Sequence, residues 1–424
     1  MKNILEQQDL RKDGKRKEIL EAVNQAFFKN DPALKVRSYI ENRSDILKSK
    51  RIKVIGFGKA AYEMYLGAQQ ALGNRIVYGG IIIPDDLVVD NNIINAEVFH
   101  GTHPFLSEKS IDSTEKLISK LSPLSREDTV LVLISGGGSS LFELLNEGIT
   151  LEKYREITKC MMNNGADIQE LNAVRYLFSK VKGGKLKNFL YPARIISLII
   201  SDVPGDDIRF IASGPLSDPP DDSLIFKTIK KFGKKCSLDF NYKYINNLKN
   251  FDAENNIIIR NEDFVFEISE YLKTRGHRVL NLGSGISGSV TNVSRMIHRI
   301  SEDYFRLIDR PYFFVGGGET SVKVRGKGIG GRNLEMCLRF ILNIKKGERF
   351  IFSSIGTDGI DGPSNAMGGI VDNYTLNVLS KRKIRDFLSN SESLTPLKIS
   401  KDVIITGRTG NNVSDIFVGY VEKI

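Results

Sequence analysis

Short apolar runs rich in β-branched residues alternate along this chain with longer segments of helical period. The runs that predict strands lie at residues 52–55, 80–83, 130–134, 195–200, 256–259, 278–282, 312–315, 349–353 and 403–406. This alternation is typical of βαβ units, in which helices cover both faces of a parallel sheet. The sequence therefore predicts an α/β fold with parallel strands.

The length of the chain predicts more than one domain. A chain of 424 residues corresponds to about two or three domains. The turn-forming cluster SDPPDD at 217–222 and the polar, lysine-rich stretch at 230–249 interrupt the alternation. We therefore expect a boundary near residue 240, with an N-terminal domain at 1–240 and a C-terminal domain at 241–424.

Composition and local patterns narrow the class of protein. Hydrophobic residues make up 41% of the chain, which excludes a disordered protein. No apolar run approaches the ~18–20 residues that span a bilayer, and the start of the chain lacks the apolar core of a signal peptide. We therefore expect a soluble, cytoplasmic protein with no membrane partner.

The three cysteines suggest neither a disulfide framework nor a metal site. Cys160, Cys236 and Cys337 lie far apart without metal-ligand spacing and are expected to be reduced core thiols.

The net charge of +10 can attract nucleic acid, acidic membranes or small anions. The sequence has neither an aromatic and basic RNA-binding pattern nor zinc-finger spacing, so nucleic acid is not an expected partner. The densest basic run, RKDGKRK at 11–17, precedes a helical pattern and is expected to form a solvated helix face.

Glycine-rich segments follow the predicted strands. Ligands of open α/β sheets bind beyond the carboxyl ends of the strands, and glycine lets backbone N–H groups approach a ligand closely. We therefore expect an anionic ligand that carries phosphates. The segments are GFGKAA (56–61), SGGGSS (135–140), SDVPGDD (201–207), GGGETS (316–321), GTDGIDGPSNAMGG (356–369) and GRTGNN (407–412).

Two of these segments suit phosphate directly. GFGKAA places Lys59 where a loop meets a helix, which adds a positive charge to the backbone donors. SGGGSS lacks the GxxxxGK[ST] spacing of the P-loop but offers hydroxyls and backbone donors. The residues of this second segment that are predicted to hold nucleotide phosphates are Ser135, Gly136, Gly137, Gly138, Ser139 and Ser140.

Acidic and basic side chains add to the predicted site. Asp202 and Asp358 lie nearest their strand ends and are candidate ligands of Mg²⁺, which prefers carboxylates and phosphates. The other acids of these loops, Asp206, Asp207 and Asp361, are expected in turns or helix caps. Among the basic side chains, Arg332 and Arg175 suit bidentate binding of carboxylate or phosphate. Lys182 is an alternative candidate for binding such an anion. Arg325 and Lys327 are expected to be solvated.

Taken together, the motifs resemble those of the glycerate kinases that make 2-phosphoglycerate. The similarity covers nearly the whole chain: GxGKAA, His103-Pro104, SGGGSS, NxVR with KGG, SDVPGDD followed by IASGP, GGGET, GxGGRN, GTDGIDGP and TGxTGxNVxD. The resemblance implies two Rossmann-like α/β domains with mostly parallel sheets that flank a deep cleft. It also implies that ATP and Mg²⁺ are the cofactors and glycerate the acceptor.

The roles of the site residues follow from this resemblance and from position. The essential lysine, aspartate and arginine fall on Lys59, Asp202 and Arg332. Lys59, Arg175 and Arg332 are expected to bind the substrate, and Lys182 and Glu319 to join the SGGGSS segment in binding ATP. Asp202 and Asp358 are the expected metal ligands, with Asp202 as either base or ligand. The expected reaction is attack of the 2-hydroxyl of D-glycerate on the γ-phosphate of ATP.

The sequence departs from the family pattern at a few positions. Leu177 stands where the family usually has a histidine, Leu106 and Ser107 replace the PD of HPxPD, and Arg408 replaces a proline. These changes bear on substrate range and nucleotide preference more than on reaction type.

The sequence is also compatible with two other functions. GFGKAA after a strand, with Asp85 and Asp86 near the end of the next strand, also suits an NAD(P)-dependent hydroxypyruvate reductase. A noncatalytic nucleotide or sugar-phosphate sensor is a further alternative. The sequence leaves open whether the protein is a homodimer.

Overall fold

The computed structural model describes residues 3–7, 9–12, 14–89, 93–238 and 251–424. Contacts divide the chain into a middle unit, Pro32–Ile259, and a terminal unit formed by Met1–Asp31 together with Arg260–Ile424. The expected boundary at residue 240 lies outside the described residues.

The middle unit is built on a parallel sheet with the strand order β3-β2-β1-β4-β5-β6. Doubly wound sheets have this order, and their ligands bind where the order reverses, here between β1 and β4. The strands are β1 (Arg51–Phe57), β2 (Ile76–Pro84), β3 (Ala96–Gly101), β4 (Asp128–Ile134), β5 (Arg194–Ile200) and β6 (Glu254–Ile259).

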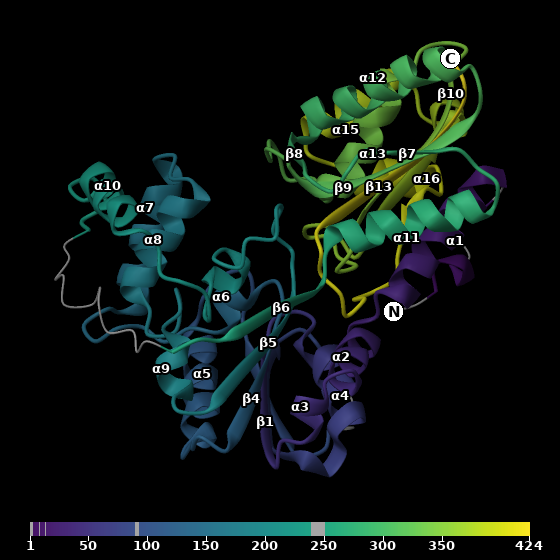
Figure 1. Ribbon diagram of the computed structural model, residues 1–424. Coiled ribbons are helices and arrows are strands. Elements are labelled where there is room, and N and C mark those ends of the chain that lie inside the picture. Colours follow the sequence, from purple (N-terminus) through teal and green to yellow (C-terminus); the bar gives the residue numbers. More distant parts are fainter. Residues whose placement is uncertain (1–2, 8, 13, 90–92, 239–250) are drawn as a thin grey trace. The chain divides into compact units, whose positions relative to one another are not determined.

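Helices cover both faces of this sheet (Figure 1). One face carries α4 (Ala61–Leu72), against which α2 (Pro32–Glu41) packs, and α3 (Ser44–Leu47) lies nearby; the other carries α5 (Glu108–Leu121) and α9 (Leu186–Leu190). The central strands β1, β4 and β5 are almost wholly buried because apolar side chains face both layers. In β4, Val130, Val132 and Ile134 face one layer, and the alternate residues Leu131 and Leu133 face the other.

A separate group of helices in the middle unit has its own core. It contains α7 (Leu151–Asn163), α8 (Ile168–Phe178) and α10 (Asp222–Phe232), which bury Tyr154, Ile157, Phe178 and Phe232. The short elements η2 (Gly73–Arg75), α6 (Gly138–Leu141) and η3 (Ile211–Ser213) complete the unit.

A disulfide joins Cys160 of α7 to Cys236, which follows α10. The prediction of reduced thiols is therefore wrong for these two cysteines. Sequence spacing could not reveal the pair, because 76 residues separate the cysteines and only the packing of the helices brings their Cα atoms to 5.6 Å. Cys337 is free and buried, as expected.

The terminal unit holds a mixed sheet with the order β12-β11-β10-β13-β9-β7, and β8 pairs with β9. The strands are β7 (Val279–Asn281), β8 (Ile286–Ser289), β9 (Tyr312–Ser321), β10 (Arg349–Gly356), β11 (Gly368–Asp372), β12 (Val403–Ile404) and β13 (Asp415–Lys423). β7 and β8 run parallel to β9, but β13 is antiparallel to both of its neighbours. The expectation of mostly parallel strands therefore fits the sheet of the middle unit better than the sheet of the terminal unit. Parallel neighbours need a crossover connection, and no helix lies between β10 and β11 or between β12 and β13.

Helices also cover both faces of the terminal sheet (Figure 1). α12 (Val290–Ile308), α13 (Arg332–Asn343) and α15 (Lys381–Ser389) lie on one face, and α1 (Gly14–Lys29) and α11 (Asn261–Thr274) on the other. Shorter elements are η1 (Ile4–Glu6), α14 (Asn373–Val378) and α16 (Leu394–Ile399). The α/β class predicted from the sequence is confirmed.

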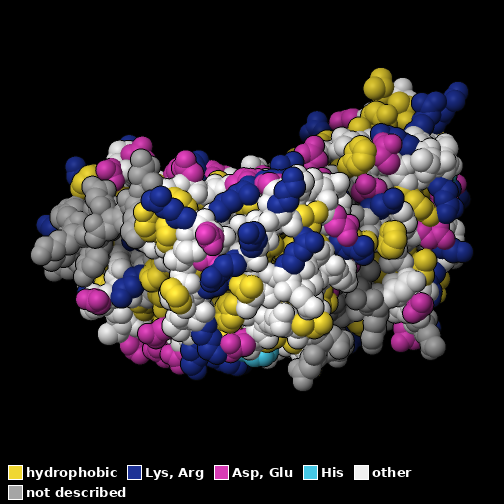
Figure 2. Space-filling view, turned by 60° about the horizontal axis from the view of Figure 1, so that its bottom comes forward, with side chains coloured by type: hydrophobic (Ala, Val, Ile, Leu, Met, Phe, Trp, Pro, Cys, Tyr) yellow, Lys and Arg dark blue, Asp and Glu magenta, His cyan; other side chains and the backbone are white. Residues whose placement is uncertain are grey.

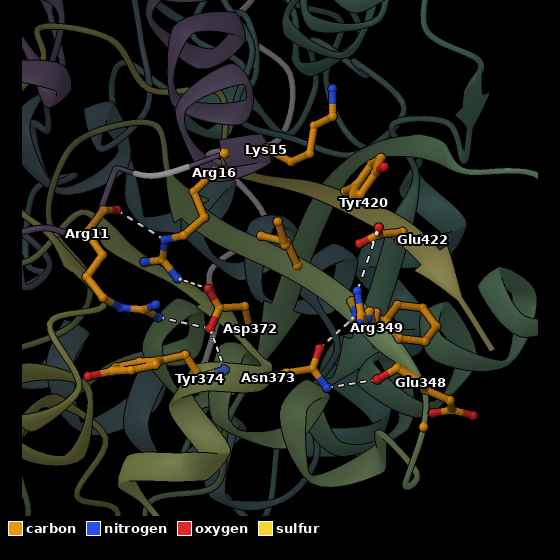
Figure 3. Close-up of a pocket in the computed structure, with 14 residues that line it drawn as sticks. Arg11, Lys15, Arg16, Glu348, Arg349, Asp372, Asn373, Tyr374, Tyr420 and Glu422 are labelled. Atoms are coloured by element: carbon orange, nitrogen blue, oxygen red, sulfur yellow. Dashed lines mark hydrogen bonds and ion pairs between the residues drawn. The ribbon is translucent and has the colours of Figure 1, made fainter.

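The basic run at 11–17 is partly buried, contrary to its predicted solvation. Arg16 is 1% exposed, and its guanidinium lies 2.9 Å from Asp372 and 3.0 Å from Asp402. Arg11 contacts the same two carboxylates at 2.9 and 2.8 Å. Figure 3 shows both arginines turned toward Asp372 at the wall of a cavity of about 610 Å³. The N-terminal segment is thus held to the terminal sheet by charge pairing.

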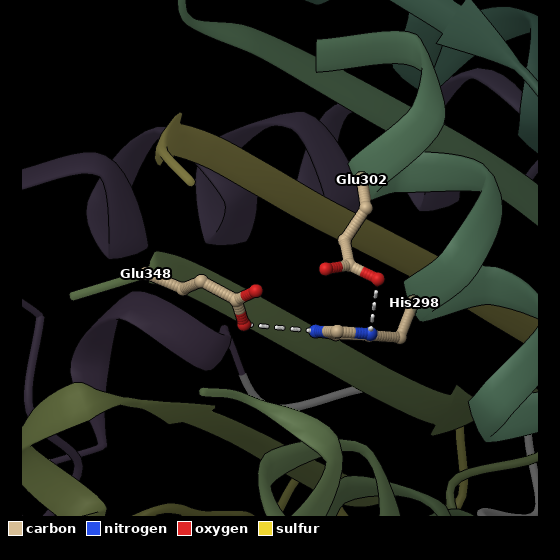
Figure 4. A group of neighbouring side chains, drawn as sticks. All are labelled: His298, Glu302 and Glu348. Atoms are coloured by element: carbon tan, nitrogen blue, oxygen red, sulfur yellow. Dashed lines mark hydrogen bonds and ion pairs between the residues drawn. The ribbon is translucent and has the colours of Figure 1, made fainter. Parts of the chain in front are cut away.

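A second buried ion network joins α12 to the turn before β10 (Figure 4). His298 Nε2 lies 3.2 Å from Glu348 Oε2, and its Nδ1 lies 3.6 Å from Glu302 Oε2. Lys345 forms ion pairs with both glutamates. Because Lys345 pairs with both glutamates and the two ring nitrogens of His298 face different carboxylates, we interpret this group as a structural polar network.

The surface carries charges of both signs. Figure 2 shows Lys and Arg side chains interspersed with Asp and Glu side chains over one face. Among the described residues, no helix is both long enough and apolar enough to cross a membrane.

Candidate active site

The turns that follow β1 and β4 lock together in the middle unit. The backbone N–H of Lys59 donates to the Gly136 carbonyl at 3.0 Å, and the N–H of Ala60 donates to Ser135 Oγ at 3.0 Å. The Ser135 N–H in turn donates to the Phe57 carbonyl at 3.2 Å. The predicted lysine turn and the predicted glycine turn therefore form one structure at the point where the strand order reverses.

Glycine is required where these turns meet. Gly58 has φ +122°, and a Cβ there would lie 2.5 Å from the Ser135 carbonyl oxygen. Gly137 has φ +84°, and a Cβ there would lie 3.3 Å from Lys59 Cγ and 3.0 Å from His103 Cδ2. The side chains of Lys59 and His103 thus both lie against the SGGGSS turn.

The loop after β5 emerges beside these turns. Phe57 of β1 is in register with Ile134 of β4, which is in register with Ile199 of β5. Because these parallel strands end at the same level, Asp202 follows β5 at the edge of the sheet that carries Lys59 and SGGGSS. Its side chain is half-buried.

The other acids of this loop differ from Asp202 in their surroundings. Hydrogen bonds from Arg209 hold the pKa of Asp207 below its usual range. Asp206 adopts φ +56° and is also half-buried. The expected turn role fits both residues.

A hydrogen-bonded chain links Arg175 to the glycine turn. Ser139 Oγ lies 2.9 Å from Ser213 Oγ, which donates to Asn172 Oδ1 at 3.2 Å. Arg175 Nη1 donates to the same Asn172 oxygen at 3.2 Å. Arg175 Nε and Asn172 Nδ2 are buried donors that lack a hydrogen-bond partner among the described residues. Unsatisfied donors of this kind suit an anionic group of a ligand.

Lys182 lies beneath the glycine turn. It is 1% exposed, and its Nζ donates to the Ser139 carbonyl at 2.6 Å and lies 3.5 Å from Glu143 Oε2. Burial lowers the pKa of Lys182 and raises that of Glu143. These contacts indicate that Lys182 supports the turn. Direct contact between Lys182 and ATP stays a prediction, and the burial of the side chain argues against it.

Arg332 organises a second cluster, in the terminal unit. Its Nε lies 2.9 Å from Asp415 Oδ2, and its Nη1 donates to Glu319 Oε1 at 2.8 Å. Asn333 Nδ2 also donates to Asp415, at 2.9 Å. Burial by itself would lower the pKa of Arg332, but the charges of Asp415 and Glu319 outweigh it and the pKa is raised.

Asp361 joins this cluster at the start of α13. Its carboxylate accepts the N–H groups of Asn333 at 3.0 Å and of Leu334 at 2.8 Å, so it caps the helix from a distant loop. Burial raises the pKa of Asp361 to about 7. The expected cap role is thus the one that the residue has.

Asp358 lies in a loop that interlocks with the GRTGNN segment. The N–H of Thr409 donates to the Asp358 carbonyl at 3.3 Å, and a Cβ on Gly359 would lie 2.1 Å from the Gly407 carbonyl oxygen. The carboxylate of Asp358 accepts the N–H of Ile360 at 3.1 Å and is half-buried.

The GGGETS segment is part of strand β9, contrary to its predicted loop structure. A Cβ on Gly317 would lie 1.8 Å from Asn261 Oδ1, and one on Gly318 would lie 1.9 Å from the Ile286 carbonyl oxygen. Close packing against α11 and β8 therefore requires these glycines. Within this fully described segment, Glu319 is the residue that forms an ion pair with Arg332.

The predicted residues thus form two clusters, one in each unit. The middle unit contains Lys59, Ser135 to Ser140, Arg175, Lys182 and Asp202, and the terminal unit contains Glu319, Arg332 and Asp358. Asp415, Asn333 and Asn172 belong to these clusters but were not among the predicted residues. Asp415 ends the TGxTGxNVxD motif, which was the available signal.

Family models match both parts of the chain. A domain of unknown function (DUF4147) matches residues 18–240, and the MOFRL family matches residues 312–415. The chain is 43% identical over 412 residues to a Picrophilus torridus protein named glycerate 2-kinase, a match that covers 95% of this chain and 96% of that protein. It is 34% identical over 390 residues to the Thermotoga maritima D-glycerate 2-kinase, covering 88% and 92%.

Solved structures agree with these matches. A crystal structure of the glycerate kinase of Thermotoga maritima has a TM-score of 0.85 and 32% identity, and the match covers 96% of this chain and 99% of that one. A Pyrococcus horikoshii structure has a TM-score of 0.76 and 30% identity, with 97% and 99% covered. The fold and these similarities define an α/β enzyme of the kinase class. The chain belongs to the glycerate kinase family, as its motifs predicted.

Proposed function

We propose that this protein is an ATP-dependent kinase that phosphorylates the 2-hydroxyl of D-glycerate to give 2-phosphoglycerate and ADP. The observation that carries the proposal is the 43% identity, over 95% of the chain, to a protein named glycerate 2-kinase. No comparison favours the hydroxypyruvate reductase or the sensor.

The geometry of the middle cluster supports roles in phosphoryl transfer. Such a transfer depends on positioning and on stabilisation of charge more than on covalent chemistry. Lys59 brings its positive charge to the SGGGSS turn, whose backbone and hydroxyls would hold phosphates of ATP. The unsatisfied donors of Arg175 and Asn172 would bind a carboxylate or phosphate oxygen.

Arg332 would provide the complementary positive charge. Its Nε and Nη1 are held by Asp415 and Glu319, which fixes the guanidinium plane. Its Nη2 has no hydrogen bond to another described residue, and we propose that this nitrogen binds a ligand oxygen. Glu319 therefore orients Arg332, and its predicted contact with ATP stays a prediction.

Mg²⁺ is part of this proposal. Asp202 and Asp358 are half-buried carboxylates that follow strand ends, and carboxylate oxygens are donors that Mg²⁺ prefers. Each is a candidate ligand in its own unit for the ion, which would supply positive charge to the phosphates. Asp202 would alternatively accept the proton of the attacking hydroxyl. The deep cleft, the cytoplasmic location and the homodimer stay predictions.

Product analysis and two variants test the proposal. The full chain is incubated with ATP, Mg²⁺ and D-glycerate, and phosphorus NMR is expected to detect 2-phosphoglycerate. Lys59→Ala and Arg332→Ala are each expected to lose on the order of 3–4 kcal/mol of transition-state stabilisation, about 10²- to 10³-fold in kcat. Lys327→Ala, in the exposed part of the loop before Arg332, is the control and should retain turnover.

Either of two results contradicts the proposal. Formation of 3-phosphoglycerate would overturn the assigned position, and wild-type turnover by both alanine variants would remove Lys59 and Arg332 from the reaction.

A further inference from the structure

A cavity of about 350 Å³ in the terminal unit is lined by arginines and by no acidic residue. Its volume lies within the range of small-molecule sites. It does not include Arg332, Glu319, Asp358 or Asp415, so it is separate from the cluster described above. The lining residues are Thr291, Ser294, Arg295, Arg325, Arg339, Leu342, Asn343, Arg385, Leu388 and Ser389.

Three helices each contribute one face to this cavity. The lining positions are 291, 294 and 295 of α12, 339, 342 and 343 of α13, and 385, 388 and 389 of α15. In every case the spacing is i, i+3 and i+4, which places the three side chains on one side of the helix. α13 packs against both other helices (Figure 1), so the three faces converge.

The fourth arginine comes from the glycine-rich loop before α13. The N–H of Arg325 donates to Ser391 Oγ at 2.8 Å, and the N–H of Gly328 donates to the Asn390 carbonyl at 2.9 Å. A Cβ on Gly326 would lie 2.7 Å from that same carbonyl oxygen, so glycine permits the close contact. The loop is therefore fastened beside the end of α15, with Arg325 at the cavity.

Most of the positive charge in the cavity is uncompensated. Arg339 pairs with Glu335 at 2.6 Å. Arg295, Arg325 and Arg385 form no ion pair with any other described residue. A concave site of one charge sign raises the local concentration of counterions. Guanidinium groups gathered in this way favour a multivalent anion, whose charge would offset their mutual repulsion.

A buried amide adds a hydrogen-bond donor. Asn343 Nδ2 is buried and has no acceptor among the described residues, although it belongs to the lining of the cavity. A buried donor without a partner is unfavourable unless a ligand or water completes it. Together with the planar forks of the arginines, this donor suits phosphate oxygens.

We propose that this arginine-lined cavity is a second anion site, which binds a small molecule carrying at least two phosphate groups. The loop that supplies Arg325 continues to Arg332, the first residue of α13. The proposal goes beyond the kinase reaction and does not depend on it.

Calorimetry with pyrophosphate as the probe tests this site. The full chain is titrated without Mg²⁺ in a buffer free of other multivalent anions, and inorganic phosphate serves as a second, weaker probe. Arg295→Gln/Arg385→Gln is expected to weaken the binding of pyrophosphate at least tenfold. The control Arg299→Gln/Arg382→Gln removes the same charge from the same two helices outside the cavity and should stay within twofold of wild type.

Further variants distinguish binding at this cavity from binding at the candidate active site and from loss of folding. Arg332→Gln should retain the pyrophosphate site. Arg325→Gln, on the exposed loop, provides an independent variant if the double variant does not fold by circular dichroism. The proposal is overturned by unchanged affinity in the folded cavity variants, by an equal loss in the control, by loss of all binding in Arg332→Gln, or by the absence of binding to wild type.

Discussion

Side chains of one type lie in different environments in this protein because their burial differs. Lys59 is half-buried beside the glycine turn, whereas Lys182 is enclosed beneath it and paired with Glu143. In the same way, Asp202 is half-buried at a strand end, whereas Asp361 is buried and caps α13. Residue type and spacing could nominate these side chains, but they could not assign the roles.

Asp361 should make the stability of the terminal unit depend on pH. Its pKa is raised from 3.8 to about 7 by burial, so the folded state binds more protons than the unfolded state between these values. The free energy of unfolding should therefore fall as the pH rises, by about 2 kcal/mol between pH 5 and 7. Urea unfolding of wild type and of Asp361→Asn, measured over this range, isolates the contribution.

The variant should lack that part of the pH dependence, because an amide does not titrate. If wild type and Asp361→Asn show parallel pH profiles, Asp361 is ionised in the folded protein throughout this range.

At the scale of elements, the alternation of apolar runs located strands well, and each of the predicted runs falls within or contains a strand of the structure. None of the predicted runs corresponds to β3, β8, β11 or β13. The omission of β13 matters most, because β13 lies between β9 and β10 and carries Asp415 at its start. Strand order depends on pairing between distant segments, which local patterns do not specify.

The disulfide is expected to stabilise the helical group formed by α7, α8 and α10. It closes a long loop, because Cys160 and Cys236 are 76 residues apart. Cys160→Ser/Cys236→Ser should therefore lower the free energy of unfolding by about 2–4 kcal/mol. Urea unfolding with and without reductant measures this change.

Reductant should weaken wild type and leave the double variant unaffected. Equal unfolding midpoints for wild type and variant under both conditions would show that the disulfide contributes no stability.

At the scale of the whole molecule, the first 31 residues belong with the C-terminal part of the chain. Arg11 and Arg16 pair with Asp372 and Asp402, across separations of more than 350 residues. Asp402 is fully buried, so its charge depends on these partners. The continuous domains expected at 1–240 and 241–424 do not include this association.

Arg16→Met should destabilise the terminal unit selectively. Loss of one partner of a buried ion pair costs about 3–5 kcal/mol, since the remaining charge stays buried. Hydrogen exchange followed by mass spectrometry is expected to show faster exchange in β11 and its neighbours and little change in 32–259. The control is Lys17→Met, on the same helix, because the Lys17 side chain is 61% exposed and its ion pair with Glu21 spans 3.9 Å.

Equal protection of β11 in wild type and Arg16→Met would mean that the N-terminal segment is not needed for the stability of the terminal unit. Faster exchange throughout both units would instead indicate general unfolding.

The sequence by itself determined the α/β class, most strand positions and the family, and it nominated the residues of the proposed chemistry. These features are local, because they follow from apolar periodicity, from glycines at tight turns and from short motifs. Only the tertiary structure decided the burial of Lys182, the pairing of Cys160 with Cys236, the position of β13 and the convergence of arginines at one cavity. Each of these depends on contacts between segments far apart along the chain, and such contacts form only when helices and sheets pack.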